Sequence, residues 1–447
     1  MSVASVGVVV LNYDGGELTL DCLRSITRSG WPADRLHIVL VDNASADNVV
    51  ERVREELPSV RVIESPVNRG FAGGCNLGIR ALGASVDFVA LVNNDATVDA
   101  SWLDPLVATL DADPRLGAAI PKIRFAGTFV DVTLTVPTHR RRGDKRDLGA
   151  LVSGARVDGV DVWDRIQRVH GLWGADPREE WTAGEALVRV PVDPANPGGT
   201  VALRLASDRP AHATLTSGPS EAAVELTKEP RWCEVSLSGA SRHIINNIGT
   251  ELNGDGYGVD RGYLEPDDGR YDEPCEIFAW CGAGALLRRS YLDDIGLFDE
   301  RLFLYYEDLE LAWRGNERGW RYRSSPKSVI DHVHAATSGE GSALKEYYNE
   351  RNRLLVLTRH ADGSVVRHAL SRFVLITLSY VRRDVFGALR RGERPDTRIV
   401  RRRLRAFAGY LRRAPSMCRT RLVSRRSARR DRLRQASARA GGDAGPS

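Results

Sequence analysis

Apolar runs alternate with amphipathic segments over the first 125 residues of the chain. Runs typical of buried strands occupy 6–11, 37–41, 60–63 and 87–92. Predicted helices follow these runs: one with an apolar side at 18–26, a polar one at 49–57 and a Gly-rich turn and helix at 68–82. Because strands that alternate with helices form parallel sheets covered by helices, we predict an α/β fold for this part of the chain.

The pattern changes near residue 126. Short runs of alternating polarity are separated by turn signals such as 194–199, and they occupy 186–190, 201–205 and 233–237. They predict an antiparallel, sandwich-like module inserted into the first domain. The α/β pattern returns at 277–287, and from residue 344 the chain reads as Arg-rich amphipathic helix. We therefore divide the chain into 1–125, 126–243, 244–343, 344–436 and a disordered tail at 437–447.

Charge is distributed unevenly along the chain. Residues 401–447 hold 15 Arg, no Lys and two Asp, whereas the other 400 residues hold 48 basic and 57 acidic side chains. Such a basic tail suits an anionic membrane surface or nucleic acid, and a solvated tail is the simpler alternative. The tail lacks interleaved aromatic residues and any known nucleic-acid-binding module, so we expect no nucleic-acid partner.

The cysteines and the apolar content bear on the cellular compartment. The six cysteines form no CxxC pair, which disfavours a zinc site or a disulfide framework. Residues 1–7 lack the basic region of a signal peptide, and the longest apolar candidate, 373–381, is too short to span a bilayer. We expect a cytoplasmic protein with reduced thiols, with the inner face of the plasma membrane as a further site of action.

Polar side chains follow the apolar run that ends at Val92. They are Asn93, Asn94 and Asp95, and the carboxyl edge of an open α/β sheet is where such folds bind ligands. A single carboxylate can hold Mg²⁺ or Mn²⁺ when substrate phosphates complete the coordination shell. Asn93 can hydrogen-bond a ribose or a metal-bound water, and a loop-capping role for Asp95 is the alternative.

Two other polar segments follow predicted strands. Asp42 and Asn43 offer a carboxylate and an amide to a pyrimidine edge or a ribose hydroxyl, or they cap a turn. The Gly-rich segment 68–76 precedes a helix, whose N-terminus favours a diphosphate. An ordinary tight turn would use the same glycines.

Two acidic residues and two histidines are further candidates. Glu307 and Asp308 begin a predicted helix after an aromatic run, where a carboxylate can act as general base or complement the helix dipole. His332 and His334 end a predicted strand and are candidate metal ligands, although a lone histidine is usually structural.

In this order, the motifs resemble the family 2 glycosyltransferases, specifically the rhamnosyltransferase-like branch with the GT-A fold. The matching stretches are LNY at 11–13, VDNAS at 41–45, NRGFAGGCN at 68–76, NND at 93–95, CGAGALLRR at 281–289, FDERLFLYYEDLELAWR at 298–314 and HVHAATSG at 332–339. The resemblance covers roughly 1–125 and 243–360. It implies a Rossmann-like, mostly parallel sheet with helices on both faces, in which 1–125 binds the nucleotide sugar and 244–343 carries the acceptor and catalytic half.

The resemblance also implies a reaction. It is a metal-dependent, inverting transfer from a nucleotide-diphosphate sugar, with dTDP-rhamnose as one candidate, to a glycan or lipid-linked acceptor in cell-envelope polysaccharide synthesis. Asp308 would be the general base beside Glu307, and Asp95 would hold Mn²⁺ or Mg²⁺ with His332 or His334. We favour His332, because its distance to Thr337–Gly339 fits the family pattern better.

The remaining implied contacts divide between donor and acceptor. Donor contacts are Asn12, Asp42, Asn43, Asn68, Gly70, Asn76, Asn93 and Asn94. Acceptor contacts are Trp280, Gly282 and Tyr306. One departure is Asn93, which replaces the first Asp of the family's DxD motif and leaves the metal one charge fewer.

Two other functional classes are weaker. A nucleotidyltransferase would show a basic residue in a Gly-rich loop after the first strand, and 11–16 has none. A non-catalytic sugar-nucleotide- or glycan-binding protein would not need Asp95, Asp308 and His332 together.

The inserted module is either a glycan-binding unit or, as we slightly prefer, a packing or homo-oligomerisation unit. Its candidate aromatic residues for glycan binding are Trp163, Trp173, Trp181 and Trp232. The amphipathic stretch 369–381 and the following Arg-rich helices make an anionic membrane surface a candidate partner.

Overall fold

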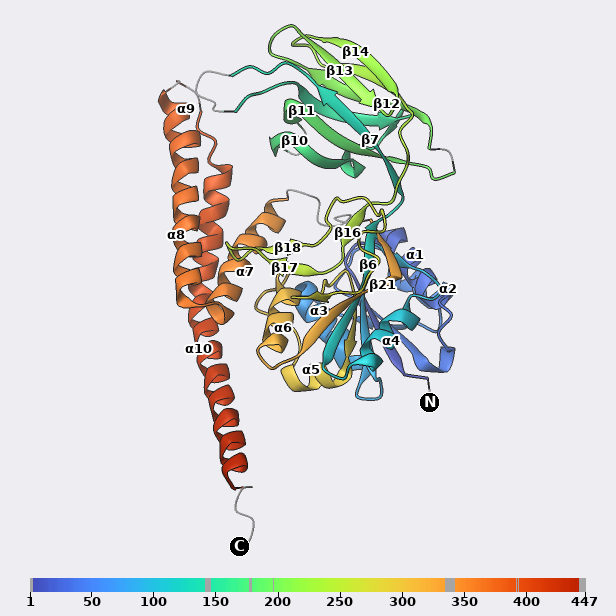
Figure 1. Cartoon of the computed structure of the whole chain (residues 1–447), viewed down its shortest axis with the longest axis vertical. Coiled ribbons are helices and arrows are strands. Elements are labelled where there is room, and N and C mark those ends of the chain that lie inside the picture. The colour runs from blue at the N-terminus through green and yellow to red at the C-terminus, as the bar shows by residue number, and fades with distance from the viewer. Residues whose placement is uncertain are drawn as a thin grey trace.

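The computed structural model describes residues 3–140, 146–176, 179–195, 197–333, 342–390, 392 and 394–441. A mixed sheet with helices on both faces, a separate antiparallel sheet and a C-terminal group of long helices make up the chain (Figure 1). The predicted α/β class with an inserted antiparallel module and a helical C-terminal region is therefore confirmed.

The larger sheet positions the candidate site. Its central order is β21-β6-β20-β4-β1-β2-β3, in which β20 runs antiparallel between β4 and β6 while the other strands share one direction. The bounds are β1 (Val6–Asn12), β2 (Leu36–Asp42), β3 (Arg61–Glu64), β4 (Phe88–Asn93), β6 (Leu116–Phe125), β20 (Gly284–Arg288) and β21 (Arg321–His332). The short strands β5 (Ala96–Val98), β16 (Ile245–Asn247) and β19 (Glu276–Ile277) pair at its margins. The carboxyl ends of β1, β2, β4 and β21 thus meet at one edge of the sheet.

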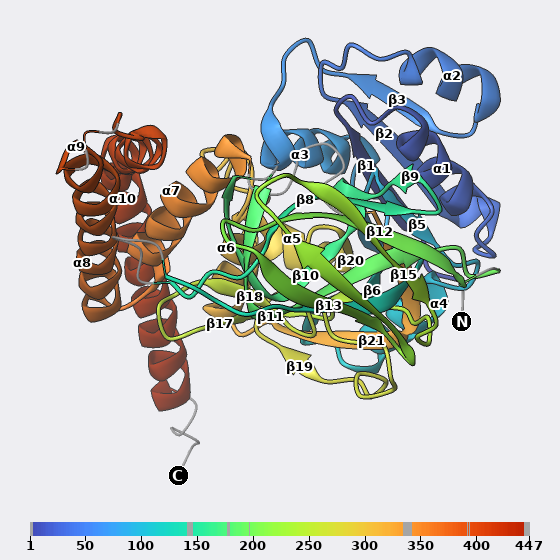
Figure 2. The same cartoon turned by 90° about the horizontal axis from the view of Figure 1, so that it is seen from above.

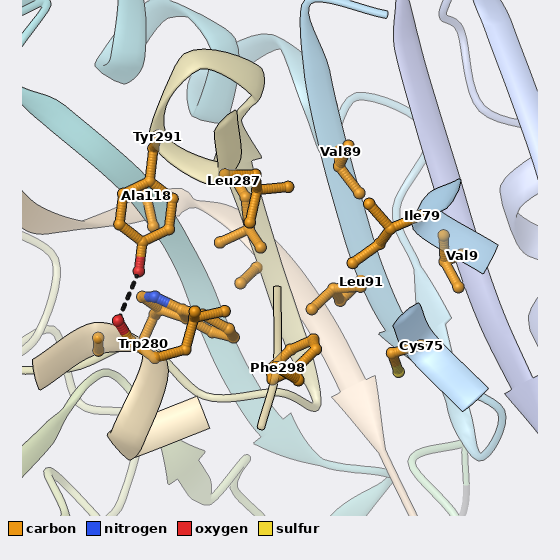
Figure 3. Close-up of a cluster of buried hydrophobic side chains, with 14 of the residues drawn as sticks. Val9, Cys75, Ile79, Val89, Leu91, Ala118, Trp280, Leu287, Tyr291 and Phe298 are labelled. Carbon is orange, nitrogen blue, oxygen red and sulfur yellow. Dashed lines mark hydrogen bonds between the residues drawn. The ribbon is translucent and has the colours of Figure 1, made fainter. Parts of the chain in front are cut away.

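Helices cover both faces of this sheet because successive strand residues point to opposite sides. Val8 and Val10 belong to the core under α1 (Gly16–Thr27), α2 (Val49–Glu56) and α4 (Leu103–Ala112). Val9, between them, belongs to the core under α3 (Gly70–Leu82), α5 (Arg289–Ile295) and α6 (Glu307–Asn316), which Figure 3 shows. A short 3₁₀-helix, η1 (Ala33–Arg35), precedes β2.

The inserted module is one antiparallel sheet with a core of its own. Its order is β14-β13-β7-β11-β8-β12-β15, and its edge strands β14 and β15 lie close together, so the expected sandwich takes the form of a single curved sheet. The bounds are β7 (Thr128–Thr135), β8 (Leu151–Val157), β9 (Val160–Asp161), β10 (Gln167–Asp176), β11 (Glu179–Val192), β12 (Gly199–Ala206), β13 (Ala211–Ser217), β14 (Ser220–Leu226) and β15 (Arg231–Leu237). A 3₁₀-helix, η2 (Trp163–Arg165), lies between β9 and β10, and a two-stranded hairpin, β17 (Thr250–Leu252) and β18 (Gly258–Asp260), follows the module.

Long helices form the C-terminal part. They are α7 (Ala343–His360), α8 (Gly363–Tyr380), a π-helical turn η3 (Val381–Phe386), α9 (Gly387–Arg390) and α10 (Arg398–Gly441). In Figures 1 and 2, α8 and α10 lie side by side on the far side of α7 from the large sheet. Helix α10 continues to Gly441, so residues 437–441 of the segment predicted as disordered are helical, as the strong helix propensity of Arg and Ala favours. Of the residues described, no helix is long and apolar enough to cross a bilayer.

Candidate active site

A cavity of about 430 Å³ lies at the carboxyl edge of the large sheet. Strand ends, the start of α3, the β17–β18 hairpin, the loop before α6 and the start of α7 all contribute to its wall. Eleven of the residues predicted from the sequence line it: Asn43, Asn68, Gly70, Asn93, Asn94, Asp95, Gly282, Tyr306, Glu307, Asp308 and His332. The fold thus brings the N-terminal and the C-terminal motifs to one cavity.

Asp95 and His332 form a buried pair on one side of the cavity. Nε2 of His332 lies 3.0 Å from Oδ1 of Asp95 and 3.3 Å from Nδ2 of Asn93. Nδ1 of His332 lies 3.1 Å from Oδ1 of Asn246, which orients the imidazole ring. A carboxylate and an imidazole are ligands that Mn²⁺ accepts.

The donor set fits a metal that is shared with substrate. Among the described residues, no cluster of three or more His, Cys, Asp or Glu side chains could form a cation site. A cation held by Asp95 and His332 would need further oxygen ligands, which the phosphates of a substrate can supply. His334 and the segment 337–339 lie outside the described residues, so the role of His334 stays a prediction.

Two asparagines shape the Gly-rich segment at the start of α3. Oδ1 of Asn68 accepts hydrogen bonds from the Gly70 amide (2.8 Å) and from Nδ2 of Asn43 (3.0 Å), and Oδ1 of Asn43 accepts one from the Arg69 amide (2.8 Å). Gly70 has φ of +67°, and a Cβ there would lie 2.2 Å from the Phe303 carbonyl oxygen. Only glycine lets α3 begin this close to the loop that precedes α6.

Four predicted contact residues do not line the cavity. Asn12 is buried, donates to Asp42 (3.1 Å) and accepts from the Thr19 hydroxyl (2.7 Å). The direct donor contact predicted for Asn12 is therefore wrong: its amide connects β1, β2 and α1. Asp42 also accepts from the Ser45 amide (3.3 Å), and its contact with a base stays a prediction.

Asn76 and Trp280 are corrected in the same way. The Asn76 amide donates to the Phe298 carbonyl and accepts from the Phe298 N–H, both at 3.0 Å, so it holds the chain before α6 against α3. Trp280 is fully buried and packs edge-to-face on Phe298, with the ring centroids 5.9 Å apart. It is a core residue and cannot contact an acceptor.

Asp308 is held by two backbone amides at the start of α6. Its Oδ2 accepts from the Gly282 N–H (3.0 Å) and its Oδ1 from the Leu309 N–H (2.7 Å). Burial raises the pKa of Asp308, and the charge of Asp260 acts in the same direction, while the two N–H groups oppose them. A carboxylate with a raised pKa is a stronger base for an acceptor hydroxyl.

The loop before α6 is strained. Phe303, Tyr305 and Tyr306 have φ of +69°, +66° and +71°, values that residues other than glycine rarely adopt. Each such conformation costs on the order of 1 kcal/mol and persists only where the surroundings hold it. Strain of this kind is typical of functional sites, and here it directly precedes Glu307 and Asp308.

Asn352 of α7 is one residue that holds this loop, and no sequence motif predicted it. Its Nδ2 donates to the carbonyls of Leu302 (2.9 Å), Leu304 (2.8 Å) and Tyr305 (2.7 Å). Asn352 is fully buried. An asparagine just before the apolar run 354–357 was the only signal, and its partners lie 47 to 50 residues away.

The β17–β18 hairpin and α7 supply lining residues that no motif predicted. Asp260 lines the cavity, and its Oδ1 accepts from Nδ2 of Asn247 (2.6 Å) and from the Thr250 hydroxyl (3.2 Å). Lys345 and Asn349 line it from α7. The cavity wall therefore carries three acidic residues, Asp260, Glu307 and Asp308, in addition to the Asp95–His332 pair.

Glu307 makes the stability of the protein depend on pH. Only 5% of Glu307 is exposed, and burial first, then the charge of Asp308, raises the pKa of its carboxyl well above the usual range. The folded state then holds a proton that the unfolded state releases, so this group lowers stability as pH rises above the ordinary glutamate pKa. We expect Glu307→Gln to raise the free energy of unfolding by about 1–2 kcal/mol at mildly alkaline pH.

Urea unfolding at acidic and alkaline pH measures this effect. Glu55→Gln, at an exposed position of α2, is the control and should change neither value. A wild-type stability that rises with pH relative to that of Glu307→Gln would contradict a protonated Glu307 in the folded state.

Comparisons with known proteins give one family match and several low similarities. Residues 5–151 match the sequence model of Glycosyl transferase family 2, which confirms the resemblance over this segment. Over 82 residues the chain is 30% identical to N-acetylglucosaminyl-diphospho-decaprenol L-rhamnosyltransferase of Mycobacterium tuberculosis, which is 18% of this chain and 27% of the relative. The chain thus covers only about a quarter of that relative's length.

Two solved structures have backbones similar to that of this chain at low sequence identity. GalNAc-T7 with UDP, GalNAc and Mn²⁺ has a TM-score of 0.46 and 13% identity, over 80% of this chain and 48% of that one. The mannosyltransferase PcManGT from Pyrobaculum calidifontis with GDP-Man and Mn²⁺ has a TM-score of 0.37 and 14% identity, over 98% of this chain and 81% of that one.

Proposed function

With residues 5–151 as a glycosyl transferase family 2 segment, we propose that this chain is a metal-dependent, inverting glycosyltransferase. Its substrates are a nucleotide-diphosphate sugar and an acceptor hydroxyl. The observation that carries the proposal is that the Asp95–His332 pair and the amide-held Asp308 line the same cavity. The Asp95–His332 pair suits the leaving diphosphate, and Asp308 suits the nucleophile.

At the donor side, Asp95 and His332 would hold Mn²⁺ or Mg²⁺, which when bound offsets the negative charge of the leaving diphosphate. Asn246 keeps the His332 ring oriented for this task. The N-terminus of α3, shaped by Gly70 and Asn68, adds the positive end of a helix dipole at the cavity wall.

At the acceptor side, Asp308 takes the proton from the acceptor hydroxyl as its oxygen bonds to the anomeric carbon. The bond between that carbon and the diphosphate oxygen breaks as the new bond forms, and the diphosphate leaves with the electron pair. Attack from the face opposite the leaving group inverts the anomeric centre. The Gly282 and Leu309 amides hold the carboxylate in one orientation during the transfer.

The name of the mycobacterial relative supports a proposal for the donor and acceptor classes. The mycobacterial relative is named a rhamnosyltransferase that acts on an N-acetylglucosaminyl-diphospho-lipid. We propose dTDP-rhamnose as the first donor to test and a glycan or lipid-linked glycan of the cell envelope as the acceptor. Tyr306 and Gly282, which line the cavity beside Asp308, are the proposed acceptor-side wall.

A panel of dTDP-, UDP- and GDP-sugars with Mn²⁺ or Mg²⁺ tests this function. We expect one donor to release its nucleoside diphosphate only with metal, and Asp95→Ala to lower that rate on the order of 100-fold. Asp99→Ala, an exposed aspartate four residues on, is the matched control and should retain the activity.

Three results would contradict the proposal in different ways. Full activity of Asp95→Ala with metal would remove Asp95 from the metal site. Binding of a nucleotide sugar without turnover of any acceptor would favour a non-catalytic binding protein. Release of pyrophosphate from a nucleoside triphosphate and a sugar phosphate would favour a nucleotidyltransferase.

A further inference from the structure

The outer helical layer, defined as residues 363–390 and 398–422, exposes an unusual number of apolar side chains. Of the eighteen large apolar residues exposed in the described part of the chain, eight lie in this layer: Val374, Leu375, Leu378, Phe386, Leu389, Leu404, Leu411 and Leu422. Leu375 is 64% exposed. Such a concentration marks an interaction surface, whereas single exposed apolar residues are ordinary.

These side chains are not needed for packing within the layer. Its inner face has its own set of contacts, in which Phe407 of α10 stacks on Phe373 of α8 and on Tyr410. Arg403 reaches across the same seam to the Thr377 hydroxyl (3.0 Å) and to Glu350 of α7 (2.7 Å). The eight exposed apolar side chains are therefore available to another partner.

The charge of the layer identifies the chemistry of that partner. Residues 363–441 contain 23 Arg, no Lys and four acidic residues. On α10 the exposed Arg405 and Arg412 directly follow the exposed Leu404 and Leu411, and Arg419 continues the seven-residue spacing. Arginine beside apolar side chains at helical spacing is typical of helices that lie in a bilayer surface, where the guanidinium groups meet lipid phosphates.

Other partners fit this surface less well. A second copy of the chain would bring the same excess of Arg against itself, and like charges oppose that contact. Nucleic acid would accept the Arg charge but would leave the leucines without an apolar environment, and exposed aromatic residues for base stacking are scarce here, with Phe386 alone among the large ones. An anionic bilayer satisfies both the charge and the apolar side chains.

We propose that the outer helical layer binds the surface of an anionic phospholipid bilayer, with its leucines in the headgroup–acyl boundary. Helix α7 connects this surface to the cavity: Leu344 and Lys345 line the cavity, and the Thr358 and Tyr410 hydroxyls lie 3.1 Å apart at the contact with α10. If the proposed function holds with a lipid-linked acceptor, the bilayer would present that acceptor near the start of α7.

Co-sedimentation of the full chain with vesicles tests the surface independently of enzyme activity. We expect binding to phosphatidylcholine vesicles that contain phosphatidylglycerol, and little binding to phosphatidylcholine alone. The variant Leu375→Ser/Leu378→Ser/Phe386→Ser should weaken binding at least about tenfold. The variant Arg405→Gln/Arg412→Gln/Arg419→Gln should weaken it on the order of 100-fold at low salt and reduce its salt dependence.

The control is Val67→Ser/Val160→Ser, which changes two exposed valines outside the layer and should bind as the wild type does. Thermal unfolding and circular dichroism establish that each variant is folded. If the Leu and Phe changes leave vesicle binding at the wild-type level, the proposal is overturned, and charge attraction alone explains the binding. A dimer that the Leu and Phe changes convert to monomer would assign the surface to a second copy. Tighter binding to RNA than to anionic vesicles would assign it to nucleic acid.

Discussion

Asp308→Asn should lower kcat for sugar transfer about 1,000-fold while the KM for the nucleotide sugar changes little. The amide cannot accept a proton from the acceptor hydroxyl, whereas the proposed donor site uses Asp95 and His332 and does not involve Asp308. Initial-rate kinetics with both substrates varied measures the two parameters separately.

The matched control is Asp293→Asn, which removes an exposed carboxylate of α5 outside the cavity and should retain full kcat. Asparagine can also accept from only one of the Gly282 and Leu309 amides, so thermal unfolding must accompany the kinetics. A variant that is folded and keeps more than about a tenth of the wild-type kcat would contradict the role of Asp308 as general base.

The pH profile gives a second readout of the same residue. Because burial raises the pKa of Asp308, its basic form disappears at a higher pH than that of an exposed aspartate as the solution is acidified. The acid limb of kcat against pH should therefore lie above the ordinary aspartate range. The residual activity of Asp308→Asn should lack this limb.

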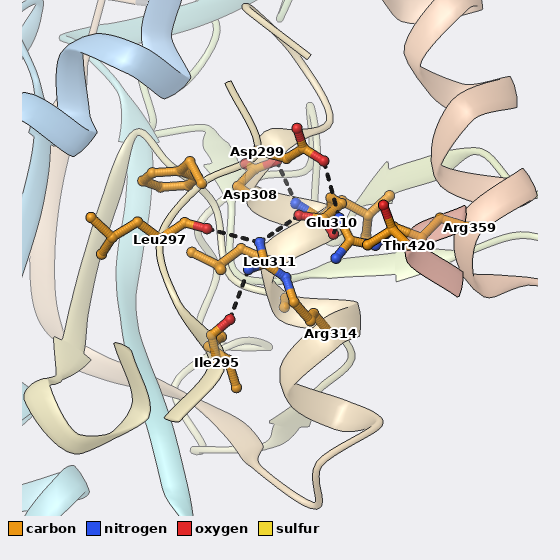
Figure 4. A network of polar contacts seen from close by, with 12 residues as sticks. Ile295, Leu297, Asp299, Asp308, Glu310, Leu311, Arg314, Arg359 and Thr420 are labelled. Atoms are coloured by element: carbon orange, nitrogen blue, oxygen red, sulfur yellow. Dashed lines mark hydrogen bonds and ion pairs between the residues drawn. The ribbon is translucent and has the colours of Figure 1, made fainter. Parts of the chain in front are cut away.

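Glu310→Gln should lower the free energy of unfolding by about 3–5 kcal/mol, the typical cost of removing one partner from a buried ion-pair network. Glu310 is fully buried on α6 (Figure 4), and its carboxylate lies 2.7 Å from Arg314, 2.5 Å from Arg359 and 3.2 Å from His360. The neutral amide would remove the carboxylate that Arg314 contacts, and it would leave Arg359 with Asp299 and His360 with Glu317 as their remaining carboxylate partners.

Burial alone would raise the pKa of Glu310, but Arg314, His360 and Arg359 outweigh it and hold that pKa well below its usual range. The stabilisation is therefore present above the ordinary glutamate pKa and is lost as pH falls. Urea unfolding at neutral and at acidic pH should show a difference between wild type and Glu310→Gln that shrinks on acidification.

Glu317→Gln is the control for this network. Glu317 contacts the other nitrogen of the same histidine, His360, at 2.9 Å, but its side chain is 41% exposed. Water can replace that contact, so we expect a loss of about 1 kcal/mol or less. Equal losses from Glu310→Gln and Glu317→Gln would show that burial does not decide the strength of the network.

The Glu310 network also bears on the site. It joins α6, which begins with Glu307 and Asp308, to the end of α7. Asp299, just before the strained loop, lies 3.0 Å from Arg359 in the same network. Together with Asn352, these contacts with α7 position the loop and the proposed base. Helix α7 also packs against the outer helical layer.

Several site residues were predictable because they stand at strand ends. Asn93 and His332 are the last residues of β4 and β21, and Asp95 is the second residue after β4. Strands that run in one direction place their carboxyl ends at one edge of a sheet. Glu307 and Asp308 were predictable as the start of a helix. Strand ends and helix starts depend on neighbouring residues, so they can be predicted from the sequence.

Other residues were not predictable because their roles depend on distant contacts. Asn246 and Asn352 act through partners 86 and about 50 residues away, and nothing near them in the sequence marks those partners. Trp280 shows the opposite error: an aromatic residue beside a motif can line a pocket or fill a core, and only packing decides which.

By itself, the sequence determined the order of strands and helices, the break at the inserted module, the motifs at the carboxyl edge and the Arg-rich end. Apolar periodicity, turn residues and charge are properties of neighbouring residues, so they can be read along the chain. The tertiary structure alone decided which polar residues face the cavity and which hold the fold, as Asn12 and Asn76 do. It also decided which apolar residues of the outer helical layer remain exposed. Burial is a property of residues that are distant in sequence and packed together in space.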